Sequence, residues 1–476
     1  MRRGNGRIGG IGRTEAEPNR NQRAAENERR KTRLHMHERS LVRRAGRTKV
    51  TGMSALPLRR DAAPADPSPS VVRPLAAPSS IAAPLPATDA AALARLTALF
   101  ASTAADHDRD GGFPRANFIE LQSRGLIGLV VPRALGGGGA DLATARRVIA
   151  AVAQGEPATA LILTMTWLQL QGLGRRDGRW PAALRERVQR DAVERGALIN
   201  SLRVEPDLGS PARGGLPATV ARRVDGGWRL SGHKLYTTGI EGLSWLAVWG
   251  RTDEAAPRVG TFLVPRAAAG VRVIASWDHL GLRASGSHEV VFEDVALPLD
   301  HAVDLRAPAD WAADAGGPAD VAAHALQQAW MTVLLGALYD GVARAACDWL
   351  VDFLNRRAPG SLGAPLASLA RVQEHVGEIE ALLHVNRVLL DRAAADVDAG
   401  RPPGAIDSGL LKHTVTTQAI RAVEAALKLT GNHGLSRRNP LERHHRDVLC
   451  GRVHTPQDDA VLAAAGRRAL QAREPA

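Results

Sequence analysis

Residues 277–298 read Trp-Asp-His-Leu-Gly-Leu-Arg-Ala-Ser-Gly-Ser-His-Glu-Val-Val-Phe-Glu-Asp-Val-Ala-Leu-Pro, and this stretch decides the fold. The glycines and serines between positions 281 and 287 are typical of a turn. The run that follows is rich in valine and ends at a proline, which predicts a short β-strand. A turn that leads into a strand indicates a β domain in this part of the chain.

The segments around this strand extend the β domain, which we place at residues 196–318. Residues 218–224 and 228–232 flank Asp225-Gly226-Gly227, a pattern that predicts a hairpin with an Asp-Gly turn. Residues 245–250 and 260–265 are further apolar runs of strand length. The middle of the chain is therefore predicted to form an antiparallel β domain.

Helical patterns lie on both sides of the β domain. Before it, apolar residues recur at helical spacing within residues 88–195, with helices expected at about 91–101, 113–124, 141–156 and 157–174. After it, residues 319–476 are expected to hold a four-helix bundle with helices at about 321–357, 366–399, 404–430 and 456–472. The predicted class is α+β, with an N-terminal all-α domain, a β domain and a helical bundle.

The net charge of the chain comes from its first residues. Residues 1–60 carry 17 Lys and Arg against five Glu, which gives +12 of the total of +13. Residues 1–87 are predicted to be a disordered basic tail and Pro/Ala linker, or to include sequence upstream of a true start at Met53; a nucleic-acid or membrane tether is the other interpretation. The nearly neutral remainder indicates no nucleic-acid partner for the folded body.

Apolar runs, cysteines and histidines in the sequence bear on the cellular compartment and on metal binding. No apolar run reaches the length of a membrane span, and no apolar core follows the basic start, so we expect a cytoplasmic protein with no membrane partner. The two cysteines, Cys347 and Cys450, predict neither a disulfide framework nor a metal cluster. His444 and His445 are adjacent, a spacing that does not suit a metal site.

Two motifs are similar to those of the acyl-CoA dehydrogenase superfamily of flavoproteins. Residues 280–295 match its "LG-(I/L)-R-x-S-x-(T/S)-x-E-V-x-F-x-D-V" run, and residues 125–139 match "G-(L/I)-x-G-(I/L)-x-x-P-x-x-x-G-G-x-G". The second motif lacks the Lys-Ser/Thr that would make its glycines a phosphate loop. The resemblance covers residues 88–472. It implies a β-barrel for the middle domain, FAD as the default cofactor with FMN as the alternative, and a homotetramer.

The resemblance implies which residues hold the flavin ring. Residues 204–210 correspond to "T-E-P-x-x-G-S", with Val204 in place of the Thr and Ser210 near the cofactor phosphate. Residues 234–239 correspond to "K-x-(W/F/Y)-x-T-N-(G/A)", with Tyr236 as the aromatic against the flavin and Thr238 as the hydroxyl near N5. An ordinary turn for the first segment and plain sheet-edge residues for the second remain the alternatives.

The resemblance also implies contacts to the flavin phosphates and adenosine from the last domain of a neighbouring subunit. Arg357 corresponds to the Arg of "R-x-x-F-G", but the Phe-Gly is lost. Lys428, Gly431 and Asn432 fall in the place of "Q-x-x-G-G-x-G", where the Gln and one Gly are replaced. The adenosine end of the site is therefore altered, which keeps FMN open as the cofactor.

The position of the catalytic base departs from the common dehydrogenase pattern. Acyl-CoA dehydrogenases remove a proton with a carboxylate, often the Glu of "R-D-x-x-x-x-x-I-Y-E-G-T", and that place is Thr455 here, after His454. Asp340 and Asp458 are weak substitutes. The superfamily's two-component monooxygenases read "R-D-x-x-x-x-x-L-H-D-P", where a His near neutral pH can donate a hydrogen bond or a proton to a flavin peroxide. His454 as a backbone-bonded loop residue is the other interpretation.

These residues favour a monooxygenase that uses reduced flavin and O₂, with His454 and Thr455 at the catalytic position. The alternatives are an FAD-dependent acyl-CoA dehydrogenase with a displaced base and a non-catalytic flavin-binding subunit. The expected partners are a small-molecule substrate (an acyl-CoA, or an organosulfur or aromatic compound) and a separate flavin reductase or an electron-transfer flavoprotein.

Overall fold

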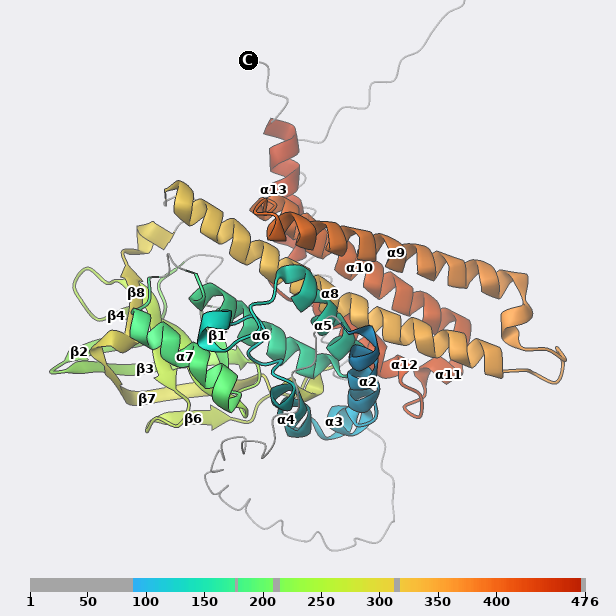
Figure 1. Ribbon diagram of the computed structural model, residues 1–476, viewed down its shortest axis with the longest axis horizontal. Coiled ribbons are helices and arrows are strands. Elements are labelled where there is room, and N and C mark those ends of the chain that lie inside the picture. Colours follow the sequence, from blue (N-terminus) through green and yellow to red (C-terminus); the bar gives the residue numbers. More distant parts are fainter. Residues whose placement is uncertain (1–88, 176–178, 209–214, 312–316, 472–476) are drawn as a thin grey trace, which may run out of the picture. The chain divides into compact units, whose positions relative to one another are not determined.

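The computed structural model describes residues 89–175, 179–208, 215–311 and 317–471. The predicted tail and linker, residues 1–87, and the predicted phosphate contact Ser210 lie outside the described residues. Helices come first, a sheet follows, and long helices complete the chain (Figure 1). This confirms the predicted fold class.

The main regular elements of the N-terminal domain, in its described part, are α-helices. Its helices are α2 (Ala90–Ala101), α3 (Ala104–Asp110), α4 (Arg115–Ser123), α5 (Leu142–Gly155), α6 (Pro157–Leu173) and α7 (Ala182–Arg195). The Glu156 carboxylate ends α5 and caps α6, since it accepts the N–H groups of Ala158 and Thr159 at the first turn. The cap separates two helices whose bounds lie within one or two residues of the predicted 141–156 and 157–174.

The glycine cluster before α5 is a packing motif. A Cβ at Gly137 would lie 2.2 Å from the Val131 carbonyl oxygen, and one at Gly138 would lie 2.6 Å from the Leu129 carbonyl oxygen. Glycine is therefore needed for this segment to lie against residues 128–131. The N–H groups of Gly138 and Gly139 donate to backbone carbonyls of the same segment.

The middle domain is an eight-stranded sheet. Its strands are β1 (Leu198–Leu202), β2 (Val220–Val224), β3 (Gly227–Thr237), β4 (Leu243–Thr252), β5 (Val259–Pro265), β6 (Val271–Ile274), β7 (His288–Pro298) and β8 (Ala302–Arg306). The order is β6-β7-β3-β2-β4-β5-β8, and β1 pairs with β4. The predicted hairpin is confirmed, because β2 and β3 pair through Val224 and Gly227.

The sheet is mixed, which differs from the wholly antiparallel sheet expected from the sequence. β4 pairs in parallel with both β1 and β2, while its pairing with β5 is antiparallel. The reason is connectivity: β1 enters the sheet directly from α7, and β4 returns beside it after the β2–β3 hairpin. Sequence patterns identify strands and tight turns, but they do not show which distant strands pair.

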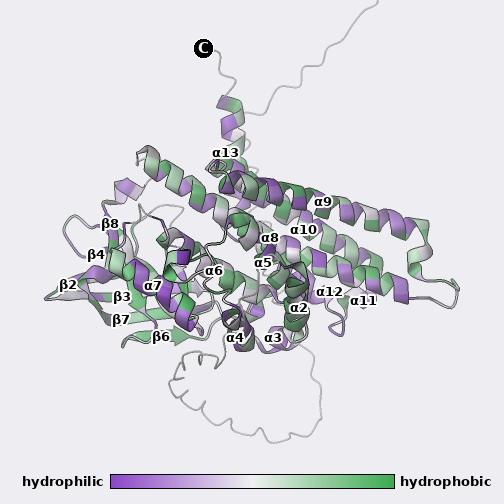
Figure 2. Cartoon of the chain, viewed as in Figure 1, coloured by the Kyte–Doolittle hydropathy of each residue, from purple (hydrophilic) through white to green (hydrophobic). Residues whose placement is uncertain are grey.

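Three long α-helices and three shorter ones make up the described part of the last domain. They are α8 (Pro318–Arg356), α9 (Ala370–Asp398), α10 (Ala405–Thr430), α11 (Asn432–Leu435), α12 (Leu441–Leu449) and α13 (Asp458–Gln471). α8 is long and apolar enough to cross a membrane by length and composition, but half of its most apolar window is buried inside the protein, as in a core helix. α9 alternates polar and apolar residues along its length (Figure 2), and Val385 and Val388 on it are exposed.

Candidate functional site

The last residues of β3 present an aromatic side chain, Tyr236, to solvent. Tyr236 has a φ of 55°, in the left-handed region that non-glycine residues rarely adopt, and Gly239 follows at 78°. The Tyr236 ring is 54% exposed and meets Trp277 and His279 edge-on at 6.4 and 6.2 Å. Trp277 and His279 stack on each other at 3.6 Å. The end of β3 therefore places the Tyr236 ring at the surface, where the Trp277 and His279 rings contact its edge.

Beside this ring lies a chain of buried hydroxyl groups. The Ser285 and Ser287 hydroxyls are 2.8 Å apart, and Ser287 donates to the Thr238 hydroxyl at 3.0 Å. Asn200 donates to the Thr238 carbonyl at 3.1 Å and fixes the backbone there. Because Thr238 accepts from Ser287, its own O–H is left to donate to a ligand. The three hydroxyls thus converge on one polar donor next to an exposed aromatic ring.

A buried ion pair holds the neighbouring segment against β3. The Lys234 ammonium lies 2.7 Å from the Glu205 carboxylate, and both side chains are almost completely buried. Burial lowers the pKa of Lys234 to about 8, although Glu205 opposes the change. Val204 accepts the Leu235 N–H through its carbonyl at 3.0 Å. Its N–H is therefore the better placed of its two backbone groups for a ligand.

These features fit a flavin ring. A flavin needs an apolar surface against its face and hydrogen-bond donors along its N5 edge. Tyr236 offers the first and Thr238 the second, and the Thr238 donor is oriented by Ser287. The roles of Tyr236, Thr238 and Val204 in flavin binding stay predictions, with the Val204 backbone as its available group.

The residues predicted for the adenosine end gather at one end of the bundle. Arg357 follows the last residue of α8, and Lys428, Gly431 and Asn432 lie at the junction of α10 and α11. All four are exposed. The Phe353 and His433 rings, 5.1 Å apart, bring these two ends together. The result is a basic, solvent-facing surface suited to an anionic group.

His454 comes two residues after the short 3-10 turn Cys450–Arg452, which follows α12 in the chain. Its Nδ1 is 2.5 Å from the Tyr339 hydroxyl on α8. The residue is half-buried, whereas Thr455 is exposed. Burial, with a smaller effect of the Lys412 charge, lowers the pKa of His454 to about 4. The imidazole is therefore neutral at physiological pH.

The two acids considered as substitute bases are both engaged. Asp340 is buried and accepts from the Arg344 guanidinium at 2.7 Å. Burial raises the pKa of Asp340, although Arg344 counteracts this. Asp458 lies 3.3 Å from the buried Lys412 ammonium and 3.3 Å from the His413 ring. Each acid thus neutralises a neighbouring cation of the bundle.

The Arg446-Asp447 dipeptide ties the His454 segment to the decisive sequence stretch. Arg446 forms two bonds to Asp108, at 2.8 and 2.6 Å, and a third to the Leu280 carbonyl at 2.9 Å. Asp447 is buried and accepts the Leu282 N–H at 2.7 Å. Burial raises the pKa of Asp447 to about 7. This dipeptide brings together the bundle, the N-terminal domain and the turn that carries Ser285 and Ser287.

Comparison with known proteins matches most of the described residues. Family models of the acyl-CoA dehydrogenase N-terminal, middle and C-terminal domains match residues 91–174, 203–295 and 319–468. A putative acyl-CoA dehydrogenase of Bacillus subtilis, YdbM, is 32% identical over 372 residues, which cover 78% of this chain and 93% of that protein. The chain belongs to the acyl-CoA dehydrogenase family. It is a flavin-dependent oxidoreductase, and FAD is the usual cofactor of its family.

Other proteins similar to this chain are not named acyl-CoA dehydrogenases. The L-evernosamine nitrososynthase of Micromonospora sp. is 29% identical over 397 residues, covering 79% of this chain and 88% of that protein. The structure of KijD3 in complex with FMN and dTDP-3-amino-2,3,6-trideoxy-4-keto-3-methyl-D-glucose is 30% identical, with a TM-score of 0.70 and coverage of 84% and 96%. FMN-bound TdsC from Paenibacillus sp. A11-2 shares the fold, with a TM-score of 0.71 at 21% identity, over 80% and 97% of the two chains.

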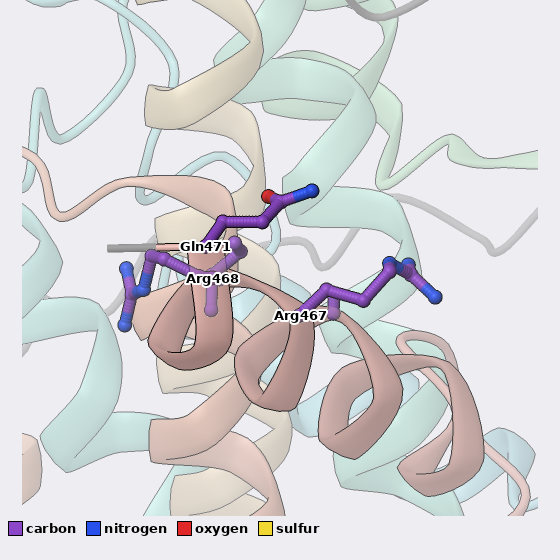
Figure 3. Close-up of a pocket in the computed structure, with 5 residues that line it drawn as sticks. Arg467, Arg468 and Gln471 are labelled. Carbon is purple, nitrogen blue, oxygen red and sulfur yellow. The ribbon is translucent and has the colours of Figure 1, made fainter. Parts of the chain in front are cut away.

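Two further features of this family member lie apart from the residues above. A surface hollow between α10 and α13 is lined by Ile406, Ala464, Arg467, Arg468 and Gln471 (Figure 3). Arg468 there forms an ion pair with Asp407 at 2.7 Å, and none of the lining residues belongs to the candidate site. Within the described ranges, no group of three or more His, Cys, Asp or Glu side chains is arranged to hold a metal ion.

Sequence reasoning missed several residues of the site. Ser285 and Ser287 were available as a Ser-x-Ser pattern in the decisive stretch, but only the structure shows them in contact with Thr238. Tyr339 lies in the middle of a long apolar helix, where an aromatic residue is read as core packing. Lys412 is likewise on a core helix, and its burial could not be read from its neighbours.

Proposed function

We propose that this flavoprotein is a monooxygenase that receives reduced flavin and uses O₂ to oxygenate a small molecule. The overall reaction is reduced flavin plus O₂ plus substrate, giving oxidised flavin, oxygenated substrate and water. One oxygen atom goes to the substrate and the other leaves as water with the two hydrogens of the reduced flavin. The flavin, when bound, supplies the two electrons.

The observation that carries this proposal is the replacement of the carboxylate base by His454 and Thr455. Removal of a proton beside a thioester carbonyl needs a carboxylate within reach of that carbon. Thr455 has no basic group, and Asp340 and Asp458 are engaged with Arg344 and Lys412. A neutral His454, in contrast, is suited to donating a hydrogen bond to an oxygen atom in the site.

The relatives support this choice of reaction. A nitrososynthase and the FMN-bound KijD3 are 29–30% identical to this chain over most of its length. KijD3 binds an amino-keto sugar nucleotide, which adds an amine-bearing small molecule to the organosulfur and aromatic compounds as a substrate class. FMN suits the altered adenosine motif at Lys428 and Asn432, since FMN has no adenosine to bind.

The proposal assigns a role to each group. Tyr236 packs against the ring and Thr238 donates to it, while the Val204 backbone orients its edge. Arg357, Lys428, Gly431 and Asn432 would bind the phosphate of a flavin held by a neighbouring copy. The assembly is then a homotetramer or a dimer with a shared site, and a separate reductase supplies the reduced flavin. We place this reaction in the cytoplasm.

A second function is favoured by one observation. YdbM, at 32% identity, is named as a putative acyl-CoA dehydrogenase. A dehydrogenase would need a base other than Thr455, and Asp340 and Asp458 would each have to leave their cation partners. The two functions differ in which redox state of the flavin is bound tightly.

Anaerobic titration of the protein with reduced and with oxidised FMN and FAD tests the proposal. A monooxygenase supplied by a reductase is expected to bind reduced flavin at least about tenfold more tightly than oxidised flavin, a difference of about 1.4 kcal/mol. The protein as purified should be nearly colourless. Stoichiometric, tightly held oxidised FAD in the purified protein would contradict the proposal and favour the dehydrogenase.

A further inference from the structure

Tyr339 has a single polar contact within the described residues, and that contact is His454. The Tyr339 side chain is completely buried on α8, and its hydroxyl lies 2.5 Å from His454 Nδ1. The two rings are 5.8 Å apart and tilted by 38°. Gly451 lies against the same ring, since a Cβ there would be 3.3 Å from both Tyr339 and Thr416. The absence of a side chain at Gly451 lets the His454 segment pack closely on α8.

The direction of this hydrogen bond follows from the surroundings. In one arrangement the Tyr339 O–H donates to Nδ1, and the imidazole proton sits on Nε2. In the other, Nδ1–H donates to the Tyr339 oxygen, and the buried O–H is left without an acceptor among the described residues. An orphaned buried donor disfavours the second arrangement by roughly 5- to 150-fold. Burial also raises the pKa of Tyr339 well above its ordinary value, so the hydroxyl keeps its proton.

Burial, more than the surrounding charges, keeps the His454 ring in its neutral form, although a backbone hydrogen bond at Cys450 acts in the opposite direction. Lys412 on α10 is completely buried, and its positive charge opposes a second proton on the imidazole. Asp458 on α13 is 3.3 Å from Lys412 and is the acid that balances that ammonium group. Asp447, on α12, has its carboxylate bonded to the Leu282 N–H. A neutral ring carries one proton, and the Tyr339 hydroxyl is the side-chain group that meets Nδ1.

We propose that Tyr339 is a positioning residue that holds His454 in the Nε2–H tautomer, so that His454 presents a fixed, neutral N–H donor to the reaction site. The tautomer itself follows from the Tyr339–His454 contact. The use of that donor in oxygenation rests on the proposed function. A residue of α8 thus decides which ring nitrogen of His454 donates a hydrogen bond and which one accepts.

Nitrogen NMR of the flavin-free protein tests the tautomer without any measurement of activity. The full chain is labelled with ¹⁵N-histidine and sedimented. Solid-state spectra are recorded for wild type and for His454→Gln, and the signals missing from the His454→Gln spectrum are assigned to the two His454 nitrogens. The same spectra are then recorded for Tyr339→Phe. Thr416→Val is the matched control, because it removes a neighbouring buried hydroxyl that bonds only to carbonyls of its own helix, those of Lys412 and His413.

In wild type and in Thr416→Val, we expect at least about 80% of His454 to show a protonated Nε2 and an unprotonated Nδ1. This fraction corresponds to the roughly fivefold preference that is the lower estimate for an orphaned buried donor. Tyr339→Phe should shift the ring to a mixture of both tautomers. A wild-type ring protonated on Nδ1 would overturn the inference, even if the variant failed to fold. An unchanged tautomer in Tyr339→Phe would overturn it as well. Failure of the oxygenation reaction with the expected tautomer present would count against the proposed function alone.

Discussion

The buried pair of Glu205 and Lys234 predicts an unequal response to the loss of either partner. Glu205 accepts four hydrogen bonds: from Lys234 at 2.7 Å, from the Thr219 hydroxyl at 2.6 Å, and from the N–H groups of Ala218 and Thr219 at 2.7 and 3.0 Å. For Lys234, the carboxylate of Glu205 is the partner that the structure shows. Glu205 therefore keeps three donors without Lys234, whereas Lys234 without Glu205 is left buried and unpaired.

The magnitudes follow from this count. In Glu205→Gln, the buried amine of Lys234 loses its counter-charge, and breaking a buried pair in this way costs about 3–5 kcal/mol. In Lys234→Met, the carboxylate loses one charge-assisted bond of about 1.5–3 kcal/mol and keeps the other three. We therefore expect Glu205→Gln to lower the free energy of unfolding more than Lys234→Met. The double variant should cost less than the sum of the two.

The pH dependence of the Glu205→Gln variant provides a second signature. Burial lowers the pKa of Lys234 to about 8 even beside Glu205, below its ordinary value of 10.5. The unfolded chain then holds a proton that the folded protein releases, so the stability of the variant should rise with pH up to about 10.5. Urea unfolding of the flavin-free protein, followed by tryptophan fluorescence, measures each variant. A Lys234→Met variant less stable than Glu205→Gln would refute this reasoning.

Three further predictions concern other parts of the chain. His454→Ala should keep flavin binding but release most of the reducing equivalents as hydrogen peroxide, with oxygenation reduced about 10²–10⁴-fold; His454→Gln, which retains an N–H donor, should lose less, and equal losses in both would contradict a donor role. Asp447→Asn should gain in Tm on wild type as the pH rises from about 4 to about 7, because the raised pKa of Asp447 makes the folded protein hold a proton that the unfolded chain releases in that range; a constant difference in Tm would count against this. Removal of residues 1–87 should leave Tm and flavin affinity unchanged, as their composition lacks core-forming residues, and a fall of more than a few degrees would show that they stabilise the body.

Much of the fold could be predicted from local patterns. The Asp225-Gly226 turn and the apolar runs on either side determine the β2–β3 hairpin, because the turn type and the strand pairing are set by adjacent residues. The long helices of the bundle follow from apolar periodicity in the same way. The parallel pairing of β1 with β4 could not be predicted, since it joins residues that are about 45 positions apart and no local turn specifies it.

The site shows the same division between local and distant information. Tyr236 and Thr238 lie in a motif that resembles the family's flavin-ring strand, so the sequence alone names them as candidates. The state of His454 depends on Tyr339, which is 115 positions away, and on Lys412 from a third helix. Asp340 and Asp458 were reasonable candidates by residue type, but only the folded structure shows their cation partners.

The central claim is that this family member does not abstract a proton from an acyl-CoA. Anaerobic mixing of the flavin-loaded protein with acyl-CoA thioesters, from butyryl to palmitoyl, tests this claim most directly. Bleaching of the flavin absorbance is followed without a reductase, for wild type and for Thr455→Glu, which restores a carboxylate at the base position. We predict no bleaching by any thioester in either form. Rapid bleaching of the wild-type flavin by an acyl-CoA would contradict the account, and variants of Asp340 and Asp458 would then identify the base.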